Sequence, residues 1–231
     1  MGVFTASNVA FMLQGLLNTI VISAASIVLS IAFGTLLALA KSYCRGRWSW
    51  LRWLVTAYIE LFRCTPNLLW ILIFRFTVQG DNILVSILTF TVFTSAVMAE
   101  IVRGGLNALP KGQFEAAQSQ GFGFVDTMRL IVLPQAFKIA FPSLFNNLIS
   151  LLKDTSLASS ITVVELFTSA QQIAARTYEP FALYCEAALI YLIFSTLLTW
   201  LQGYLESKLV WRSHDNTNVT AKGRKKPMVG I

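Results

Sequence analysis

The chain has 231 residues, of which 55% are hydrophobic and 13% are charged, and its formal net charge is +7. This composition excludes an ordinary soluble domain, in which about 25% of residues are charged. The apolar residues form uncharged runs of membrane length, which predicts an integral membrane protein. Most Lys and Arg residues flank these runs, so membrane topology accounts for the positive charge and nucleic acid is not an expected partner.

Five apolar segments are long enough to cross a bilayer of about 30 Å as helices. In chain order they cover residues 13–40, 54–76, 83–102, 139–164 and 181–205. Small residues in the first segment, from Ser23 to Ser26 and at Gly34, predict close packing of another helix. Thr65-Pro66 favours a break or kink within the second segment. Residues 165–180 are predicted to be an irregular or short helical link between the last two segments.

The distribution of Lys and Arg predicts the orientation in the membrane. With the N-terminus outside, residues 41–52, 103–138 and 206–231 lie inside and hold fourteen of the eighteen Lys and Arg residues, as the positive-inside rule requires. We therefore predict an all-α membrane protein with about five transmembrane helices, N-out and C-in. Its predicted parts are a short extracytoplasmic N-terminus (residues 1–12), a transmembrane domain (13–209) and a basic cytoplasmic tail (210–231).

The cytoplasmic segment between the third and fourth spans has the pattern of packed helices. Gly104-Gly105 before it allows a sharp turn into the cytoplasm, and Pro110 marks a helix start. Glu115 falls in the first helical turn, and Gly121 suits a glycine C-cap. A second amphipathic piece follows over residues 124–132, and Pro134 is expected to break or kink it. The coupling region, residues 110–134, is therefore predicted to form a docking surface.

This region also carries a family resemblance. The pattern EAA-x3-G-x9-I-x-LP is met by Glu115, Ala116, Ala117, Gly121, Ile131, Leu133 and Pro134. It resembles the EAA loop of permease subunits of bacterial ABC importers, and more closely the permeases for histidine, glutamine, glutamate and arginine, over roughly residues 16–209. The resemblance implies a coupling helix that sits in a cleft of a separate ATPase subunit. The residues assigned to this contact are Glu115, Ala116, Ala117 and Gly121.

Charged and polar residues inside the second span are candidates for the translocation path. Glu60 and Arg63 are three residues apart and share a helix face, and Thr65 stands at the predicted break. Relatives in the resembling family usually read R-G-T-P here, whereas this chain has Cys64 in place of the glycine and Asn67 after the proline. The alternative to a path is an ion pair between Glu60 and Arg63 that holds a kinked helix.

A second candidate cluster interrupts the fourth span. Its members combine charges and hydroxyls, and they are Lys153, Asp154, Thr155 and Ser156. An amino acid zwitterion needs a cation for its carboxylate and acceptors for its ammonium group, and this cluster supplies both. The alternative is a solvated charge pair at the outer interface. Glu100, near the inner end of the third span, is a candidate for an inner gate.

Residues that build catalytic or metal sites are scarce. Cys44, Cys64 and Cys185 are far apart, and His214 is the single histidine, so neither a disulfide framework nor a metal centre is expected. The sequence lacks G-x-x-x-x-G-K-[ST], so no P-loop binds ATP on this chain. We therefore expect a protein that is not an enzyme and binds no cofactor, with ATP and Mg on a partner chain.

The resemblance implies a multi-pass permease of the bacterial inner membrane that imports a polar amino acid by alternating access. The implied partners are ABC ATPase subunits, a second permease subunit in a homodimer or heterodimer, an extracytoplasmic substrate-binding protein and the lipid bilayer. Two alternatives stay open at this point. One is an amino acid carrier that works without an ATPase, and the other is a membrane anchor for an ATPase that transports nothing.

Overall fold

The computed structural model describes residues 5–44 and 46–209. Residues 1–4 of the predicted outer segment and the predicted tail, 210–231, lie outside these ranges. Every regular element in the described ranges is helical. In chain order the elements are α1 (Ala6–Tyr43), η1 (Gly46–Trp48), α2 (Ser49–Cys64), α3 (Asn67–Thr77), α4 (Asn82–Asn107), α5 (Gly112–Ser119), α6 (Phe124–Asp126), η2 (Thr127–Val132), α7 (Leu133–Asp154), η3 (Thr155–Ile161), α8 (Leu166–Thr177) and α9 (Pro180–Leu209).

Four of the described helical segments are long and apolar enough to cross a membrane. They are α1, α4, the continuous helix Phe124–Ile161 and α9, and the bent pair of α2 and α3 makes a fifth span if it is counted as one. This agrees with the predicted all-α architecture of about five spans. Residues 165–180 were predicted to be an irregular or short helical link, and the structure confirms the helical alternative as α8.

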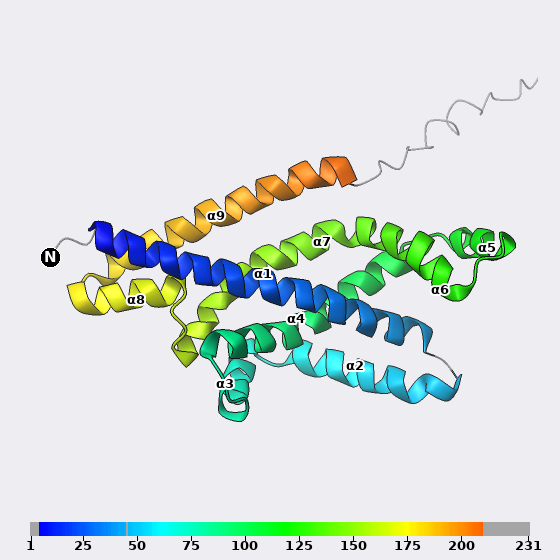
Figure 1. The fold of residues 1–231 in the computed structure, drawn as a ribbon, viewed down its shortest axis with the longest axis horizontal. Coiled ribbons are helices and arrows are strands. Elements are labelled where there is room, and N and C mark those ends of the chain that lie inside the picture. The colour runs from blue at the N-terminus through cyan, green and yellow to red at the C-terminus, as the bar shows by residue number, and fades with distance from the viewer. Residues whose placement is uncertain (1–4, 45, 210–231) are drawn as a thin grey trace, which may run out of the picture.

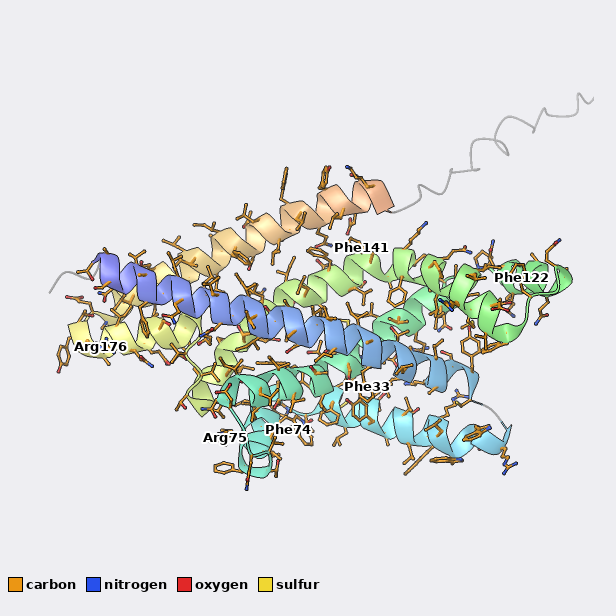
Figure 2. All side chains as sticks on the ribbon, viewed as in Figure 1. Phe33, Phe74, Arg75, Phe122, Phe141 and Arg176 are labelled. Atoms are coloured by element: carbon orange, nitrogen blue, oxygen red, sulfur yellow. The ribbon has the colours of Figure 1, made fainter. Side chains whose placement is uncertain are left out.

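Different elements lie at the two ends of the elongated molecule (Figure 1). The C-terminal end of α1 and the α5–α6 region lie at one end, and the N-terminal end of α1 and α8 lie at the other. Figure 2 shows Arg176 and Arg75 far from Phe122, which stands at the first end. The described parts of the first two basic segments that were predicted to be cytoplasmic, 41–52 and 103–138, thus lie toward the same end, as the positive-inside orientation requires.

The helix α1 runs through the middle of the bundle and packs most extensively against α4. The Ser26 hydroxyl donates to the Ile87 carbonyl at 3.3 Å, and Ser30 donates to the Thr91 carbonyl at 3.2 Å. A Cβ atom added at Gly34 would lie 2.6 Å from Met98 Cβ. The small residues therefore permit the close helix contact that the sequence predicts.

We expect Gly34→Leu to destabilise the protein by about 1–3 kcal/mol, because overpacking forces the tightly packed helices apart. Ala32→Leu is the matched control, because Ala32 lies two residues away on the exposed side of α1. The measurement is the apparent melting temperature of each purified variant in the same detergent. Equal melting temperatures for the two variants would contradict the importance of this contact.

The predicted second span is not a single straight helix. The helix α2 ends at Cys64, and α3 leaves it at 109°. Pro66 disfavours a helical conformation at the residue before it, and Thr65 is extended at φ −118° and ψ 149°. The Thr65 hydroxyl donates to the Leu61 carbonyl at 2.6 Å and accepts from Trp70 Nε1 at 2.6 Å. Thr65 thus fastens both sides of the break, which confirms the predicted interruption.

One prediction about the inner end is wrong, and one part of a second prediction is also wrong. Gly104 and Gly105 make no sharp turn, since α4 continues to Asn107. Gly105 instead permits close contact with α7, because an added Cβ would lie 2.5 Å from the Ala136 carbonyl oxygen. Pro134 does not break its helix. The preceding π-helical turn η2 bonds the Leu133 N–H to the Met128 carbonyl, five residues back, and this wider turn accommodates the proline.

Candidate functional site

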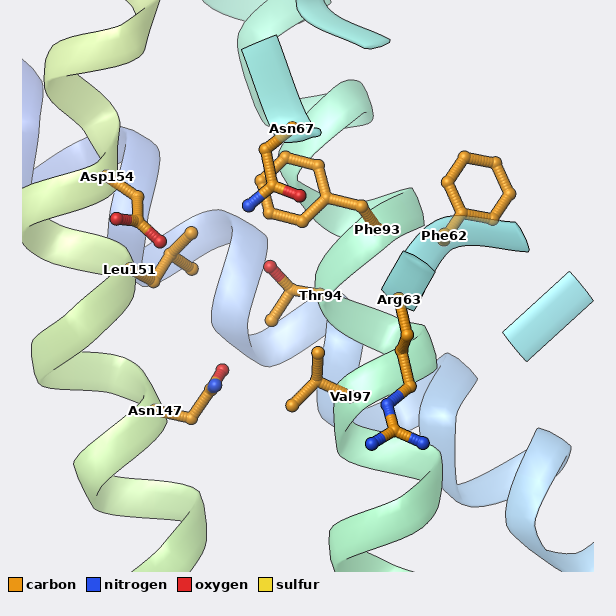
Figure 3. Close-up of a pocket in the computed structure, with 9 residues that line it drawn as sticks. All are labelled: Phe62, Arg63, Asn67, Phe93, Thr94, Val97, Asn147, Leu151 and Asp154. Carbon is orange, nitrogen blue, oxygen red and sulfur yellow. The ribbon is translucent and has the colours of Figure 1, made fainter. Parts of the chain in front are cut away.

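A cavity of about 310 Å³ lies where α2, α3, α4 and α7 meet (Figure 3). Its lining residues come from segments that are far apart in the sequence. They are Phe62, Arg63, Asn67, Phe93, Thr94, Val97, Asn147, Leu151 and Asp154. Among these nine residues Arg63 and Asp154 carry the charges, and Figure 3 shows them on opposite sides of the cavity. Polar side chains between them complete a site with a cationic side and an anionic side.

The helix breaks position the charged residues. Arg63 belongs to the last turn of α2 and Asn67 begins α3, so the turn at Thr65-Pro66 brings both side chains to the same cavity. On the opposite side, Asp154 ends α7 at the point where the chain changes to the 3-10 helix η3. Discontinuous helices of this kind commonly form binding sites in membrane transporters.

The structure joins some of the predicted path residues and separates others. Arg63 and Asp154 line the cavity, whereas Glu60 and Lys153 are exposed outside it. No ion pair joins Glu60 to Arg63 in the described part of the chain, so the alternative of a structural ion pair at the kink is wrong. The cation that faces Asp154 across the cavity is therefore Arg63. Lys153, the residue before Asp154 in the sequence, does not face it.

The remaining members of the predicted clusters have local contacts. Thr155 is fully buried, and its hydroxyl donates to the Leu152 carbonyl at 2.7 Å. Ser156 is half-buried, and neither residue lines the cavity. The chain changes from α-helix to 3-10 helix at Thr155, a change of backbone that the sequence analysis did not predict.

Glu100 lies away from this cavity, in a charged cluster at the inner end of α4. Its carboxylate accepts from Lys41 Nζ at 2.8 Å and from Arg103 Nε at 3.0 Å. The glutamate side chain is only 16% exposed, so its charge is both partly buried and neutralised. Lys41 belongs to α1, and this contact therefore ties α1 to the end of α4 that leads into the coupling region. A gating role for Glu100 stays a prediction.

The sequence analysis missed three polar residues of the cavity and a buried glutamate. Asn67, Thr94 and Asn147 stand in apolar segments, and an uncharged polar side chain inside a span is a weak signal because such groups also bond to neighbouring helices. Glu165 was treated as part of a link. It is 0% exposed and caps the N-terminus of α8.

The Glu165 carboxylate joins α8 to α9. It accepts from the backbone N–H groups of Phe167 and Thr168 at 2.8 and 2.6 Å, and from the Tyr191 hydroxyl of α9 at 3.0 Å. Beside it, the Leu166 N–H donates to the Thr19 hydroxyl of α1 at 3.2 Å. Burial raises the pKa of the Glu165 carboxyl above its usual range. The glutamate therefore holds α8 and α9 together next to α1.

We expect Glu165→Ala to destabilise the protein by about 1–3 kcal/mol, because it removes a helix cap and leaves buried donors without acceptors. Glu165→Gln should cost less, since glutamine keeps one acceptor oxygen and burial disfavours the carboxylate charge. Thermal unfolding of the purified variants measures both effects. Equal melting temperatures for Glu165→Ala and the unmutated protein would contradict the capping role.

The coupling region forms a short helix and a glycine corner. The Phe122 N–H donates to the Ala117 carbonyl at 3.1 Å, and the Gly121 N–H donates to the Gln118 carbonyl at 3.0 Å. With Gly121 at φ +81°, these bonds form a Schellman motif, which confirms the predicted glycine C-cap. Glu115 and Ala116 are exposed, whereas Ala117 is buried against the protein. The helix α5 thus presents an exposed polar face at one end of the bundle (Figure 1).

Comparison with known proteins identifies the family. Residues 30–211 match the family described as the binding-protein-dependent transport system inner membrane component. The chain belongs to this family. Members of the family are permease subunits of transporters, and the solved relatives share the helical fold described above.

Two curated relatives and two solved structures show how closely the chain follows this family. The L-cystine transport system permease protein of Bacillus subtilis is 38% identical over 189 residues, which are 79% of this chain and 81% of the relative. A probable glutamine ABC transporter permease protein of the same organism is 32% identical over 207 residues, 87% of this chain and 94% of the relative.

The solved structure of an amino acid ABC transporter with histidines is 28% identical in sequence and has a TM-score of 0.78. The match covers 87% of this chain and 95% of the chain in that structure. An inward-facing methionine ABC transporter is 16% identical in sequence and has a TM-score of 0.79. The match covers 90% of this chain and 100% of the chain in that structure, and it supports the fold alone.

Proposed function

We propose that this permease subunit imports a polar amino acid across the bacterial inner membrane. The observation that carries the proposal is the cavity with Arg63 on one side and Asp154 on the other. A guanidinium group pairs with the α-carboxylate of an amino acid, and a carboxylate pairs with its ammonium group. The names of the relatives, which refer to cystine and glutamine, favour the same class of substrate.

The uncharged lining residues define the rest of the substrate. Asn67, Thr94 and Asn147 offer hydrogen bonds, and the apolar wall includes Phe93 and Leu151. After Arg63 and Asp154 bind the zwitterion, no further charge of this cavity faces the side chain of the substrate. The cavity therefore favours an amino acid with a neutral polar side chain over one with a charged side chain.

Energy for transport comes from a separate ATPase that binds ATP and Mg. The exposed face of α5, with Glu115 and Ala116, fits a cleft of that subunit, and Gly121 sets the angle between α5 and the following helix. Closure of two ATPases moves the coupling helices of two permease subunits, and the path then opens outward by alternating access. The partner permease is a second copy or a sister chain, and an extracytoplasmic binding protein delivers the substrate at the opposite end.

Reconstitution tests this function. The full chain, its partner permease, the candidate ATPase and the candidate binding protein are placed in proteoliposomes, and uptake of labelled glutamine and cystine is measured with and without ATP. We expect uptake that requires ATP and is inhibited by unlabelled neutral polar amino acids. Uptake by the permease without the ATPase would favour a secondary carrier. ATPase binding without uptake of any of the twenty common amino acids or cystine would favour a non-transporting anchor.

A further inference from the structure

A second cavity lies at the inner end of the bundle and has a different lining. It is a groove of about 600 Å³ between the last turn of α1 and the segment formed by α6, η2 and the start of α7. We call it the inner groove. Its lining is Leu39, Ala40, Tyr43, Cys44, Phe124, Val125, Met128, Arg129 and Leu133. Arg129 is the one charged residue among these nine, and the other side chains are mostly apolar.

The inner groove lies at the level of the inner membrane interface. One wall is the end of α1, where the charge-free stretch of residues 13–40 gives way to Lys41. The adjoining segment carries Trp48, Trp50 and Trp53, which are 57%, 56% and 69% exposed, and α2 packs back along α1. Exposed tryptophans next to basic residues are typical of the headgroup region. The end of α1, and with it the groove, therefore lies at headgroup depth.

The opposite wall is strongly apolar and faces outward. Val125 is 71% exposed and Phe124 is 59% exposed, although the Phe124 ring contacts Tyr43 at 5.4 Å between centroids. Arg129 makes no ion pair within the described residues. An apolar groove with an uncompensated cation at the membrane interface matches a ligand that has a hydrocarbon chain and an anionic headgroup.

We propose that the inner groove binds an anionic phospholipid, with an acyl chain against Leu39, Met128 and Leu133 and the phosphate paired with Arg129. The volume of the groove falls in the range of about 300–1,000 Å³ that is usual for small-ligand sites. The C-terminal residues 210–231 are a poor occupant, because they carry five Lys and Arg residues and one Asp, and a cationic segment is repelled by Arg129.

The bound lipid bridges two parts of the protein that are distant in the sequence. The α1 wall belongs to the membrane bundle, and the α6–η2 wall continues directly from the Gly121 corner of the coupling region. An acyl chain between these walls fills the space that otherwise separates them, and an anion on Arg129 fastens the chain. This lipid contact does not depend on the identity of the transported substrate.

Native mass spectrometry of the full-length chain tests the proposal. The chain is purified from micelles that contain equal amounts of dioleoyl phosphatidylglycerol and dioleoyl phosphatidylcholine, and the retained lipids are counted. We expect preferential retention of phosphatidylglycerol, and we expect Arg129→Gln to reduce that retention about fivefold. Arg129→Lys should retain most of it, because the charge is kept. Ala40→Phe, which fills the groove, should reduce retention of phosphatidylglycerol without changing Arg129.

Arg47→Gln is the matched control, because Arg47 is an exposed arginine at the same end that does not line the groove. Equal loss of phosphatidylglycerol in Arg47→Gln and Arg129→Gln would reduce the effect to general surface charge and overturn the site. Unchanged retention in Arg129→Gln would also overturn it. In a separate pull-down with the candidate ATPase, an Arg129→Gln variant that kept its lipids but no longer bound the ATPase would assign the groove to the ATPase and overturn the lipid site. Equal loss of phosphatidylglycerol and phosphatidylcholine in Arg129→Gln would show that Arg129 does not recognise an anionic headgroup, and would overturn the proposal.

Discussion

Replacing Gly121 by valine is expected to reduce ATP-dependent uptake by about tenfold or more while leaving the protein in the membrane. Gly121 has φ +81°, a conformation that costs a residue with a Cβ about 1–2 kcal/mol, and more for a β-branched side chain. An added Cβ would meet no atom within 4 Å, so the effect comes from the backbone and not from a clash. The Schellman motif must then distort, and α5 loses its fixed angle to the next helix.

Gly123→Val is the matched control for this prediction. Gly123 lies two residues further along, is equally open, and has an extended conformation at φ −68° that valine adopts without strain. Uptake, basal ATPase activity and membrane level are measured for both variants in the reconstituted transporter. The expected pattern is retained ATP hydrolysis without matching uptake for Gly121→Val and near-normal transport for Gly123→Val. Normal uptake by Gly121→Val would contradict the coupling role of this corner.

Replacing Asp154 by asparagine is expected to lower the transport kcat/KM by about tenfold to a hundredfold, because a hydrogen bond to a charged group contributes about 1.5–3 kcal/mol. The side chain keeps its size, so the change tests the charge that is proposed to bind the substrate ammonium group. Arg63→Gln should have an effect of similar size through the carboxylate end. Uptake kinetics at matched membrane levels give the measurement.

Lys153→Gln separates a substrate contact from a general charge effect. Lys153 is the direct neighbour of Asp154, but it is exposed and does not line the cavity. Its replacement should leave the transport kcat/KM within about twofold of the unmutated value, as for a surface charge with little interaction energy. A larger loss for Lys153→Gln than for Asp154→Asn would place the substrate elsewhere. Unchanged kinetics for Asp154→Asn would exclude its carboxylate as a ligand.

Features with local causes could be predicted from the sequence. The break at Thr65-Pro66 follows from the missing N–H and the fixed ring of one proline, and the corner at Gly121 follows from a helix end a few residues long. The spans and their orientation follow from uncharged runs and flanking basic residues. Pro134 shows the limit of such reasoning, since the π-helical turn before it keeps the helix continuous.

The arrangement of the candidate site was decided by the tertiary structure alone. Sequence spacing placed Glu60 beside Arg63 and Lys153 beside Asp154, yet the cavity selects Arg63 and Asp154, from different helices, and leaves the other two outside. Which face of a helix points inward depends on its packing against several neighbours. A segment with apolar residues on all sides does not reveal that face from its sequence.

Glu165 and Glu100 extend this point. Both are glutamates near the ends of apolar segments, and nothing in their immediate sequence distinguishes a buried helix cap from a partner of Lys41. The sequence by itself determined the membrane class, the orientation, the helix break and the coupling corner, because each depends on neighbouring residues. Only the tertiary structure decided which charges share a cavity, because that depends on distant helices meeting in space.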